Sequence, residues 1–100
     1  MMKIYQSRSF ERTVKRLHKQ EKEIIDREIR DIADKPRAAE EKKGDLRGIF
    51  VRKFKIKTTE YLLAYQIVGE DLELIMVGHH ENYYRDLKKH MRDAPNRFQA

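Results

Sequence analysis

The chain has 100 residues, of which 40% are charged and 39% hydrophobic, and its net charge at pH 7 is +6. It has no cysteine, which excludes disulfides and thiolate chemistry, and no apolar run near the ~20 residues that span a bilayer. We expect a single domain over residues 1–100, cytoplasmic and without a membrane partner, whose basic surface favours nucleic acid or an acidic protein.

The N-terminal part of the chain predicts a short edge strand followed by two helices. Residues 1–5 lean apolar, and Ser7 or Ser9 offers a hydroxyl that can cap the first helix. Two apolar stripes with helical spacing follow, and Pro36 ends the second. The stripes consist of Phe10, Val14 and Leu17, then Ile25, Ile29, Ile32 and Ala33. We expect the two helices to pack as a hairpin across a sheet.

Three short apolar runs between Leu46 and Val77 predict consecutive strands of an antiparallel meander. A polar loop over 37–44 precedes them, tight links fall at 58–60 and 69–71, and Gly78 ends the last run. Residues 82–91 predict a final helix, followed by a flexible tail at about 93–100. The predicted fold class is α+β, a small antiparallel-rich sheet in β-α-α-β-β-β-α order with helices largely on one face.

The first strand of the meander carries a concentration of positive charge. Lys53, Lys55 and Lys57 alternate with apolar residues, so strand geometry predicts three ammonium groups on one face. With Arg47 and Arg52 they make a segment that contains no acid. Crowding of like charge destabilises a bare strand, so we expect an anion to bind here. The alternative is a solvated face or a sheet edge that lysines protect from aggregation.

The ionisable groups suit metal-free cleavage of RNA by its own 2′-hydroxyl, which needs a base, an acid and cations that stabilise the phosphorane. Adjacent His79, His80 and Glu81 lack the spacing of a helical zinc site, and no glycine-rich phosphate loop is present, so we predict no metal and no cofactor. Repulsion among the strand lysines favours proton loss from one of them, and His80 is a second candidate for proton transfer. The alternative for the histidines is an ordinary loop, while Tyr83 is expected in the core.

Several motifs, taken in order, resemble the RelE/ParE superfamily of toxins from bacterial toxin–antitoxin modules. They are Leu-Arg-Gly at 46–48, Phe-Lys-Ile-Lys at 54–57, Tyr-Leu-Leu-Ala-Tyr-Gln at 61–66 and Val-Gly-His-His-Glu-Asn at 77–82. The resemblance implies a microbial RNase fold and an acidic antitoxin through which operator DNA is contacted only indirectly. For the RelE-like branch it implies cleavage of mRNA in the ribosomal A site.

The resemblance also suggests roles for single residues. Lys55 and Lys57 match the lysine pair of the RelE-like strand, and Arg47 matches an arginine that lies near the substrate. Two family arginines are replaced, by Leu62 and by His80, and His80 resembles the histidine of YafQ-like members, which have an aromatic residue where this chain has Tyr84. Asp86 stands at the spacing of the RelE-like C-terminal tyrosine. The candidate catalytic residues are Lys55, Lys57, His80 and Tyr84, and the candidate RNA-binding residues are Arg47, Arg52, Lys53 and Arg85.

The sequence therefore predicts the toxin of a type II toxin–antitoxin system, a ribosome-dependent and metal-independent mRNA endoribonuclease that inhibits translation. Two alternatives remain open at this point. One is a ParE-like inhibitor of DNA gyrase, which needs no acid or base. The other is an inactive homologue that acts only as an antitoxin-bound corepressor. The same fold serves different activities, so the contents of the site must distinguish them.

Overall fold

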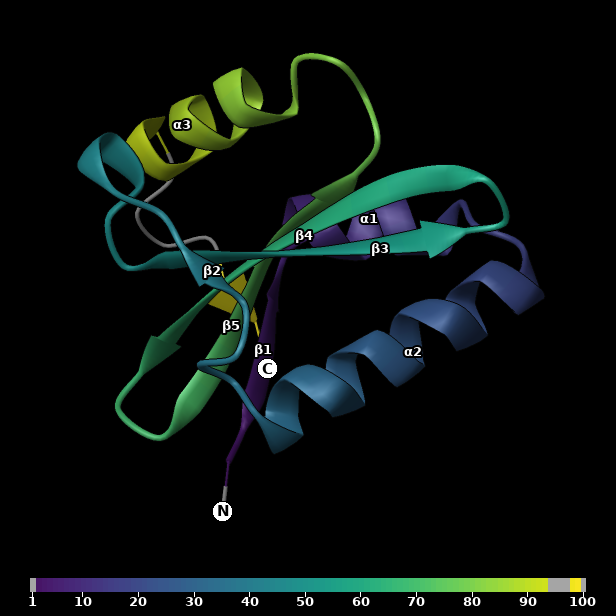
Figure 1. The fold of residues 1–100 in the computed structure, drawn as a ribbon, viewed down its shortest axis with the longest axis horizontal. Coiled ribbons are helices and arrows are strands. Elements are labelled where there is room, and N and C mark those ends of the chain that lie inside the picture. Colours follow the sequence, from purple (N-terminus) through teal and green to yellow (C-terminus); the bar gives the residue numbers. More distant parts are fainter. Residues whose placement is uncertain (1, 94–97, 100) are drawn as a thin grey trace.

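A computed structural model describes residues 2–93 and 98–99 of the chain. Its elements in chain order are β1 (Ile4–Ser7), α1 (Arg8–Lys15), α2 (Lys19–Asp34), β2 (Glu40–Glu41), the 3₁₀-helix η1 (Gly44–Leu46), β3 (Ile49–Ile56), β4 (Thr59–Val68), β5 (Asp71–Gly78), α3 (Tyr83–Asp93) and β6 (Phe98–Gln99) (Figure 1). None of the helices in these residues has the length and apolar character needed to cross a membrane.

One sheet with the strand order β2-β3-β4-β5-β1-β6 forms the centre of the molecule. Strands β1 and β5 are parallel, and every other neighbouring pair is antiparallel. The predicted α+β class is confirmed, and three short elements join the predicted ones. The polar loop contains β2 and η1, and part of the predicted tail pairs with β1 as β6. Residues 94–97 and 100 of that tail lie outside the described residues.

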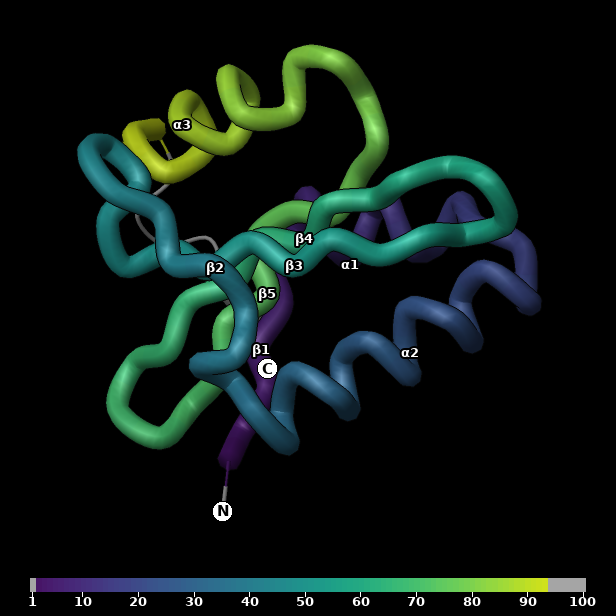
Figure 2. Tube along the Cα trace, viewed as in Figure 1, coloured from purple at the N-terminus to yellow at the C-terminus, as the bar shows by residue number. Residues whose placement is uncertain are grey.

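Helices cover both faces of the sheet, as Figure 1 shows with α2 below it and α3 above it. The face toward α1 and α2 holds the larger apolar cluster, and the face toward α3 holds the smaller one. The first includes Phe10, Ile25, Ile32, Phe50, Phe54, Leu63 and Tyr65, and the second includes Leu46, Ile49, Val51, Ala64, Ile75, Tyr83 and Leu87. Helix η1 lies beside the C-terminal half of α3 (Figure 2). The two N-terminal helices pack on the sheet as predicted, and α3 occupies the other face.

Ser7 joins the first helix to the sheet. Its side chain is fully buried; the hydroxyl accepts a hydrogen bond from the Phe10 N–H at 3.0 Å and donates one to the Ile75 carbonyl. Of the two predicted capping residues, the structure therefore uses Ser7. Helix α1 ends at Lys15, earlier than the apolar stripe predicted, and α2 begins after a short break in which Glu21 accepts a hydrogen bond from the His18 N–H.

A β-bulge in β5 changes which face its residues occupy. Ala64 pairs with Met76 and Tyr65 pairs with Leu74, so Ile75 is the extra residue on β5. Leu72 and Leu74 face α1 and α2 before the bulge, whereas Ile75 and Met76 both face α3. After the bulge, the alternation of β5 side chains between the two faces of the sheet is therefore offset by one residue. This offset places Gly78 on the face toward α3.

We expect Ser7→Ala to lower the free energy of unfolding by about 1–3 kcal/mol, because it leaves a buried N–H of α1 and the carbonyl at the bulge without partners. Urea unfolding of the purified protein measures the change. The matched control is Ser9→Ala, which removes the other candidate cap and should change stability by no more than about 0.5 kcal/mol. Equal effects of the two substitutions would contradict this role of Ser7.

Candidate functional site

An open part of the sheet lies on the face toward α3. Lys53 pairs with Leu62, and Leu62 pairs with Gly78, so these residues form one row across β3, β4 and β5. Val51 belongs to the apolar cluster under α3, and alternation places Lys53 and Lys55 on the same face. We call the surface formed by Lys53, Lys55, Leu62 and Gly78 the lysine face.

The two lysines of this face are exposed. Neither forms a salt bridge with any residue in the described part of the chain, although Glu60 is the cross-strand neighbour of Lys55. Two ammonium groups at alternate positions of one strand create a local positive potential that favours binding of an anion. The lysine face is therefore a candidate anion site.

The imidazole of His80 lies on the same face. A Cβ atom added to Gly78 would stand 3.1 Å from His80 Nδ1, which shows that the ring lies directly over the glycine. The other ring nitrogen, Nε2, is 3.0 Å from Oδ2 of Asp86 on α3. The His80 side chain is 47% exposed and so accessible to a ligand. The structure thus brings Lys53, Lys55 and His80 together on one face.

The two tyrosines at the start of α3 have different environments. Tyr83 is 1% exposed and its hydroxyl donates to the Met76 carbonyl at 2.7 Å, so it belongs to the core, as predicted. Burial raises the pKa of Tyr83, which makes it a poor proton donor. Tyr84 is only half-buried, and its ring packs edge-on against Tyr83 with the centroids 5.6 Å apart. Tyr84 is thus the tyrosine available to a ligand.

Lys42 borders Tyr84 and is a residue of the site that sequence reasoning missed. Its Nζ lies 5.2 Å from the centroid of the Tyr84 ring and forms an ion pair with Glu40. Hydrogen bonding to Glu40, and less strongly to Tyr84, raises the pKa of Lys42 against the opposing effect of burial. The Lys42 N–H donates to the Ile49 carbonyl at 2.8 Å, and this pairing orients the side chain toward α3. No residue pattern in the polar loop predicted that Lys42 pairs with Ile49 at the start of β3.

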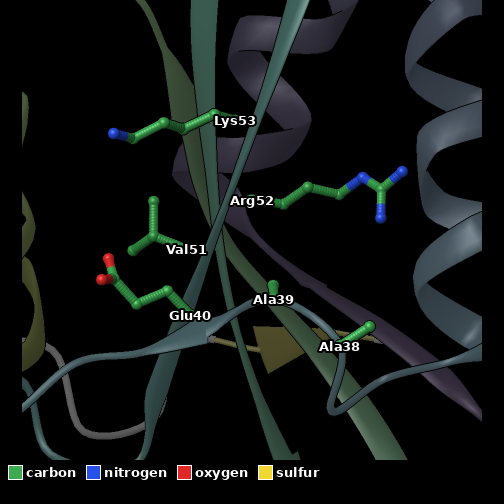
Figure 3. Close-up of a pocket in the computed structure, with 6 residues that line it drawn as sticks. All are labelled: Ala38, Ala39, Glu40, Val51, Arg52 and Lys53. Atoms are coloured by element: carbon green, nitrogen blue, oxygen red, sulfur yellow. The ribbon is translucent and has the colours of Figure 1, made fainter.

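Arg52 does not belong to the lysine face. Its side chain points away from that of Lys53, toward α2, as Figure 3 shows. There its Nε lies 2.6 Å from Glu28 and its Nη2 lies 3.5 Å from Asp31. The expectation that Arg52 shares one cationic patch with Lys53 is wrong, because consecutive strand residues face opposite sides and acids of α2 already neutralise this guanidinium.

The remaining basic candidates lie outside the lysine face. Lys57 was expected beside Lys55, but β3 ends at Ile56, and Lys57 lies in the two-residue turn with φ 58°, so its predicted place in the strand alternation is wrong. Arg47 is exposed after η1, before β3 begins. Arg85 is exposed on α3, with its Nε 3.6 Å from Oδ1 of Asp86.

A shallow depression of about 320 Å³ lies against His80 and Asp86, where α1 approaches the end of β5. Its lining includes the hydroxyl side chains of Ser9 and Thr13. His79 also lines it, and its ring packs against Tyr61 at a centroid distance of 4.8 Å, in the direction of the other apolar cluster. Within the described residues, no group of three or more histidine and acidic side chains is arranged to hold a metal ion.

Comparison with known families places this fold and site in a class. A sequence model of the ParE-like toxins of type II bacterial toxin–antitoxin systems matches residues 4–88. The chain belongs to this family, and its predicted membership of the RelE/ParE superfamily is confirmed. No curated protein matches the sequence significantly.

Two solved structures share the fold. One is a chain of the intact E. coli RelBE toxin–antitoxin complex, with a TM-score of 0.65 and 19% identity, covering 81% of this chain and 99% of that one. The other is the isolated E. coli RelE toxin, with a TM-score of 0.63 and 20% identity, covering 89% of this chain and 98% of that one. At such identities the likeness establishes the fold alone.

We expect Lys53→Gln to weaken binding of single-stranded RNA and to reduce the slope of log affinity against log salt by about 0.7, the value for one lost phosphate contact. The matched control is Arg52→Gln, which removes one charge from the adjacent residue on the opposite face and should leave the slope unchanged. Fluorescence anisotropy over a range of salt concentrations measures both. Equal slopes for the two variants would show that RNA does not select the lysine face.

Proposed function

We propose that this toxin is a metal-independent endoribonuclease that cleaves mRNA on the ribosome. The observation that carries the proposal is the juxtaposition of Lys53, Lys55 and His80 on one accessible face of the sheet. Among the described residues, two cations without salt bridges and one imidazole that can accept or donate a proton supply what transesterification of RNA needs. Ribosome dependence is inferred from the resemblance to RelE-like toxins, whose fold the chain shares.

The proposed reaction uses the 2′-hydroxyl of RNA as the nucleophile. It loses its proton to a base, its oxygen bonds to the adjacent phosphorus, and the bond from phosphorus to the 5′-oxygen breaks. The products are a 2′,3′-cyclic phosphate and a 5′-hydroxyl whose oxygen has taken up a proton. Lys53 and Lys55 stabilise the extra negative charge of the phosphorane, and His80 takes part in proton transfer.

Neighbouring residues are proposed to hold the RNA. Tyr84 presents a half-exposed ring that can stack on a base, and a hydroxyl that can donate a proton. Arg47, Lys57 and Arg85 are exposed outside the lysine face, and we infer that they contact phosphates further along the RNA. Arg52 is not included, because its charge is engaged by α2.

A second candidate function is inhibition of DNA gyrase. It is favoured by the matched family, which is described as ParE-like, and the resemblance links ParE-like toxins to gyrase. Such a binding function requires neither proton transfer nor an exposed histidine next to lysines. The nuclease is preferred because the exposed imidazole of His80 lies on the same side of the sheet as the lysine face.

We expect His80→Ala and His80→Gln to reduce single-turnover cleavage of mRNA on programmed ribosomes by about 10²–10⁴-fold while leaving ribosome binding nearly intact. Lys55→Ala should reduce both rate and affinity, since this lysine contributes phosphate charge. The matched control is His79→Gln, whose ring lies against Tyr61 and which should cleave like wild type.

Two outcomes would contradict the nuclease. Near wild-type cleavage by His80→Gln would show that the histidine has only a structural role. A wild-type protein that cleaves no mRNA on ribosomes but traps gyrase on DNA would replace the nuclease with the second candidate.

We also propose a cognate acidic antitoxin as the partner. Strand β2 pairs only with Phe50 and Val51, so in the described residues the outer edge of β3 from Arg52 to Ile56 has no neighbouring strand. A depression of about 400 Å³, lined in part by Ala38 and Ala39, lies where this open edge begins (Figure 3). An open edge flanked by lysines suits an extended acidic segment, which would add main-chain hydrogen bonds and neutralise charge.

Co-expression with the gene adjacent to this one should therefore yield a stable complex with a small acidic protein. We expect Lys53→Glu combined with Lys55→Glu to weaken the complex by about tenfold or more through charge repulsion. The control is Lys15→Glu combined with Lys19→Glu on the helices, which should change affinity little. A larger effect of the helix variant would place the antitoxin on the helices. A protein that is isolated alone, inhibits no growth and binds no partner would contradict the proposal.

A further inference from the structure

Asp86 contacts the imidazole of His80 at hydrogen-bond distance. Its Oδ2 lies 3.0 Å from His80 Nε2, and the two side chains are 44% and 47% exposed, so water and substrate both reach the pair. Asp86 lies in the first turn of α3, whereas His80 lies between β5 and that helix. The contact therefore ties the orientation of the imidazole to a helix that packs on the sheet through the buried side chains of Tyr83 and Leu87.

This contact has a chemical consequence for the imidazole. An ionised carboxylate can only accept hydrogen bonds, so Nε2 must carry the proton of neutral His80. The unprotonated nitrogen is then Nδ1, which is the atom that lies over Gly78. Gly78 is in register with Leu62, and Leu62 with Lys53, so Nδ1 lies over the row of residues that includes Lys53.

We propose that Asp86 is a positioning residue that makes Nδ1 of His80 the base of the cleavage reaction, an inference that rests on the proposed nuclease function. Neutral His80 takes the proton of the RNA 2′-hydroxyl on Nδ1 as the 2′-oxygen bonds to phosphorus. The resulting imidazolium donates to Asp86 through Nε2, and its positive charge is stabilised by the carboxylate. The leaving 5′-oxygen receives its proton from a lysine ammonium group of the lysine face or from water.

The other groups around His80 do not compete for this role. Tyr83 contacts the ring at a centroid distance of 5.8 Å, but its hydroxyl is engaged by the Met76 carbonyl. Arg85 approaches the other oxygen of Asp86, with its Nε 3.6 Å from Oδ1. Ser9 and Thr13 of α1 face the pair with neutral hydroxyls, His79 packs against Tyr61, and Lys53 and Lys55 are the cations on the same face.

The depression beside the pair fits this assignment. It is bordered by His80 and Asp86 on one side and by α1 on the other, so it lies next to the hydrogen bond that the proposal assigns to Nε2. With Nδ1 toward the lysines and Nε2 bound by the carboxylate, the two nitrogens have separate partners. The pair thus has the arrangement of a base with its orienting acid, as in other histidine–aspartate pairs.

The test compares Asp86→Asn with wild type by two measurements. An asparagine side chain keeps the size of the aspartate but has no charge and no fixed acceptor toward Nε2. We expect single-turnover cleavage on programmed ribosomes to fall by about 10–100-fold, less than for a fully buried pair. The ¹⁵N signals of the His80 ring should change from the Nε2–H form to a mixture of both forms.

The matched control is Asp93→Asn, which removes the same charge from α3 at a residue that contacts Arg92. It should cleave like wild type and leave the ring signals of His80 unchanged. Thermal unfolding of both variants corrects for stability, since a carboxylate in the first turn of a helix is itself stabilising.

Each outcome decides a separate point. If wild type cleaves and Asp86→Asn cleaves equally well with unchanged His80 ring signals, the positioning role is overturned while the nuclease stands. If wild-type His80 carries its proton on Nδ1, the assignment of the base atom is overturned whatever the activity. If wild type does not cleave at all, the nuclease function fails and the assigned base step fails with it, while the ring signals still report whether Asp86 fixes the form of His80.

Discussion

The arrangement of the candidate site depends on one extra residue in one strand. Leu72 and Leu74 of β5 face α1 and α2, and uninterrupted alternation would place Gly78 on that side as well. The bulge at Ile75 reverses the alternation, so that Gly78 joins the row of Leu62 and Lys53. The carbonyl of the bulged residue accepts the buried Ser7 hydroxyl, which also caps α1. The side chain of Ser7 therefore connects α1 to the bulge in β5, and this bulge places His80 on the face that holds the lysines.

The bulge also explains why two neighbouring histidines have different environments. His79 packs against Tyr61, whose side chain belongs to the cluster under α1 and α2, while His80 lies over Gly78 and contacts Asp86 of α3. Glycine at 78 makes this possible, since a Cβ would approach Nδ1 more closely than most such contacts in proteins. The face that contains the lysines thus receives one histidine and not the other.

The alternation of side chains along β3 made part of the site predictable from the sequence, and it also explains two predictions that were wrong. It placed Lys53 and Lys55 correctly on one face, because the apolar residues between them fill the core on the other. The predicted position of Lys57 in the strand is wrong because β3 ends one residue earlier, at Ile56. Arg52 was assigned to the lysine patch because it adjoins Lys53 in sequence, but alternation along the strand directs its side chain to α2. The bulge itself was not predictable, because residues 74–77 are all apolar and both faces are buried.

The residues that sequence reasoning missed are those joined only by tertiary structure. Lys42 reaches Tyr84 because β2 pairs with the beginning of β3, and Asp86 reaches His80 because α3 packs back over the end of β5. The chain pairs Arg52 and Lys42 with acids but leaves Lys53 and Lys55 without salt bridges among the described residues. Proteins of this superfamily share one fold, so their differences in activity are expected to depend on which side chains pair with one another at the site. Among the described residues of this chain, those choices leave Lys53 and Lys55 exposed without salt bridges and His80 exposed on the same face of the sheet, and the proposed nuclease rests on that combination.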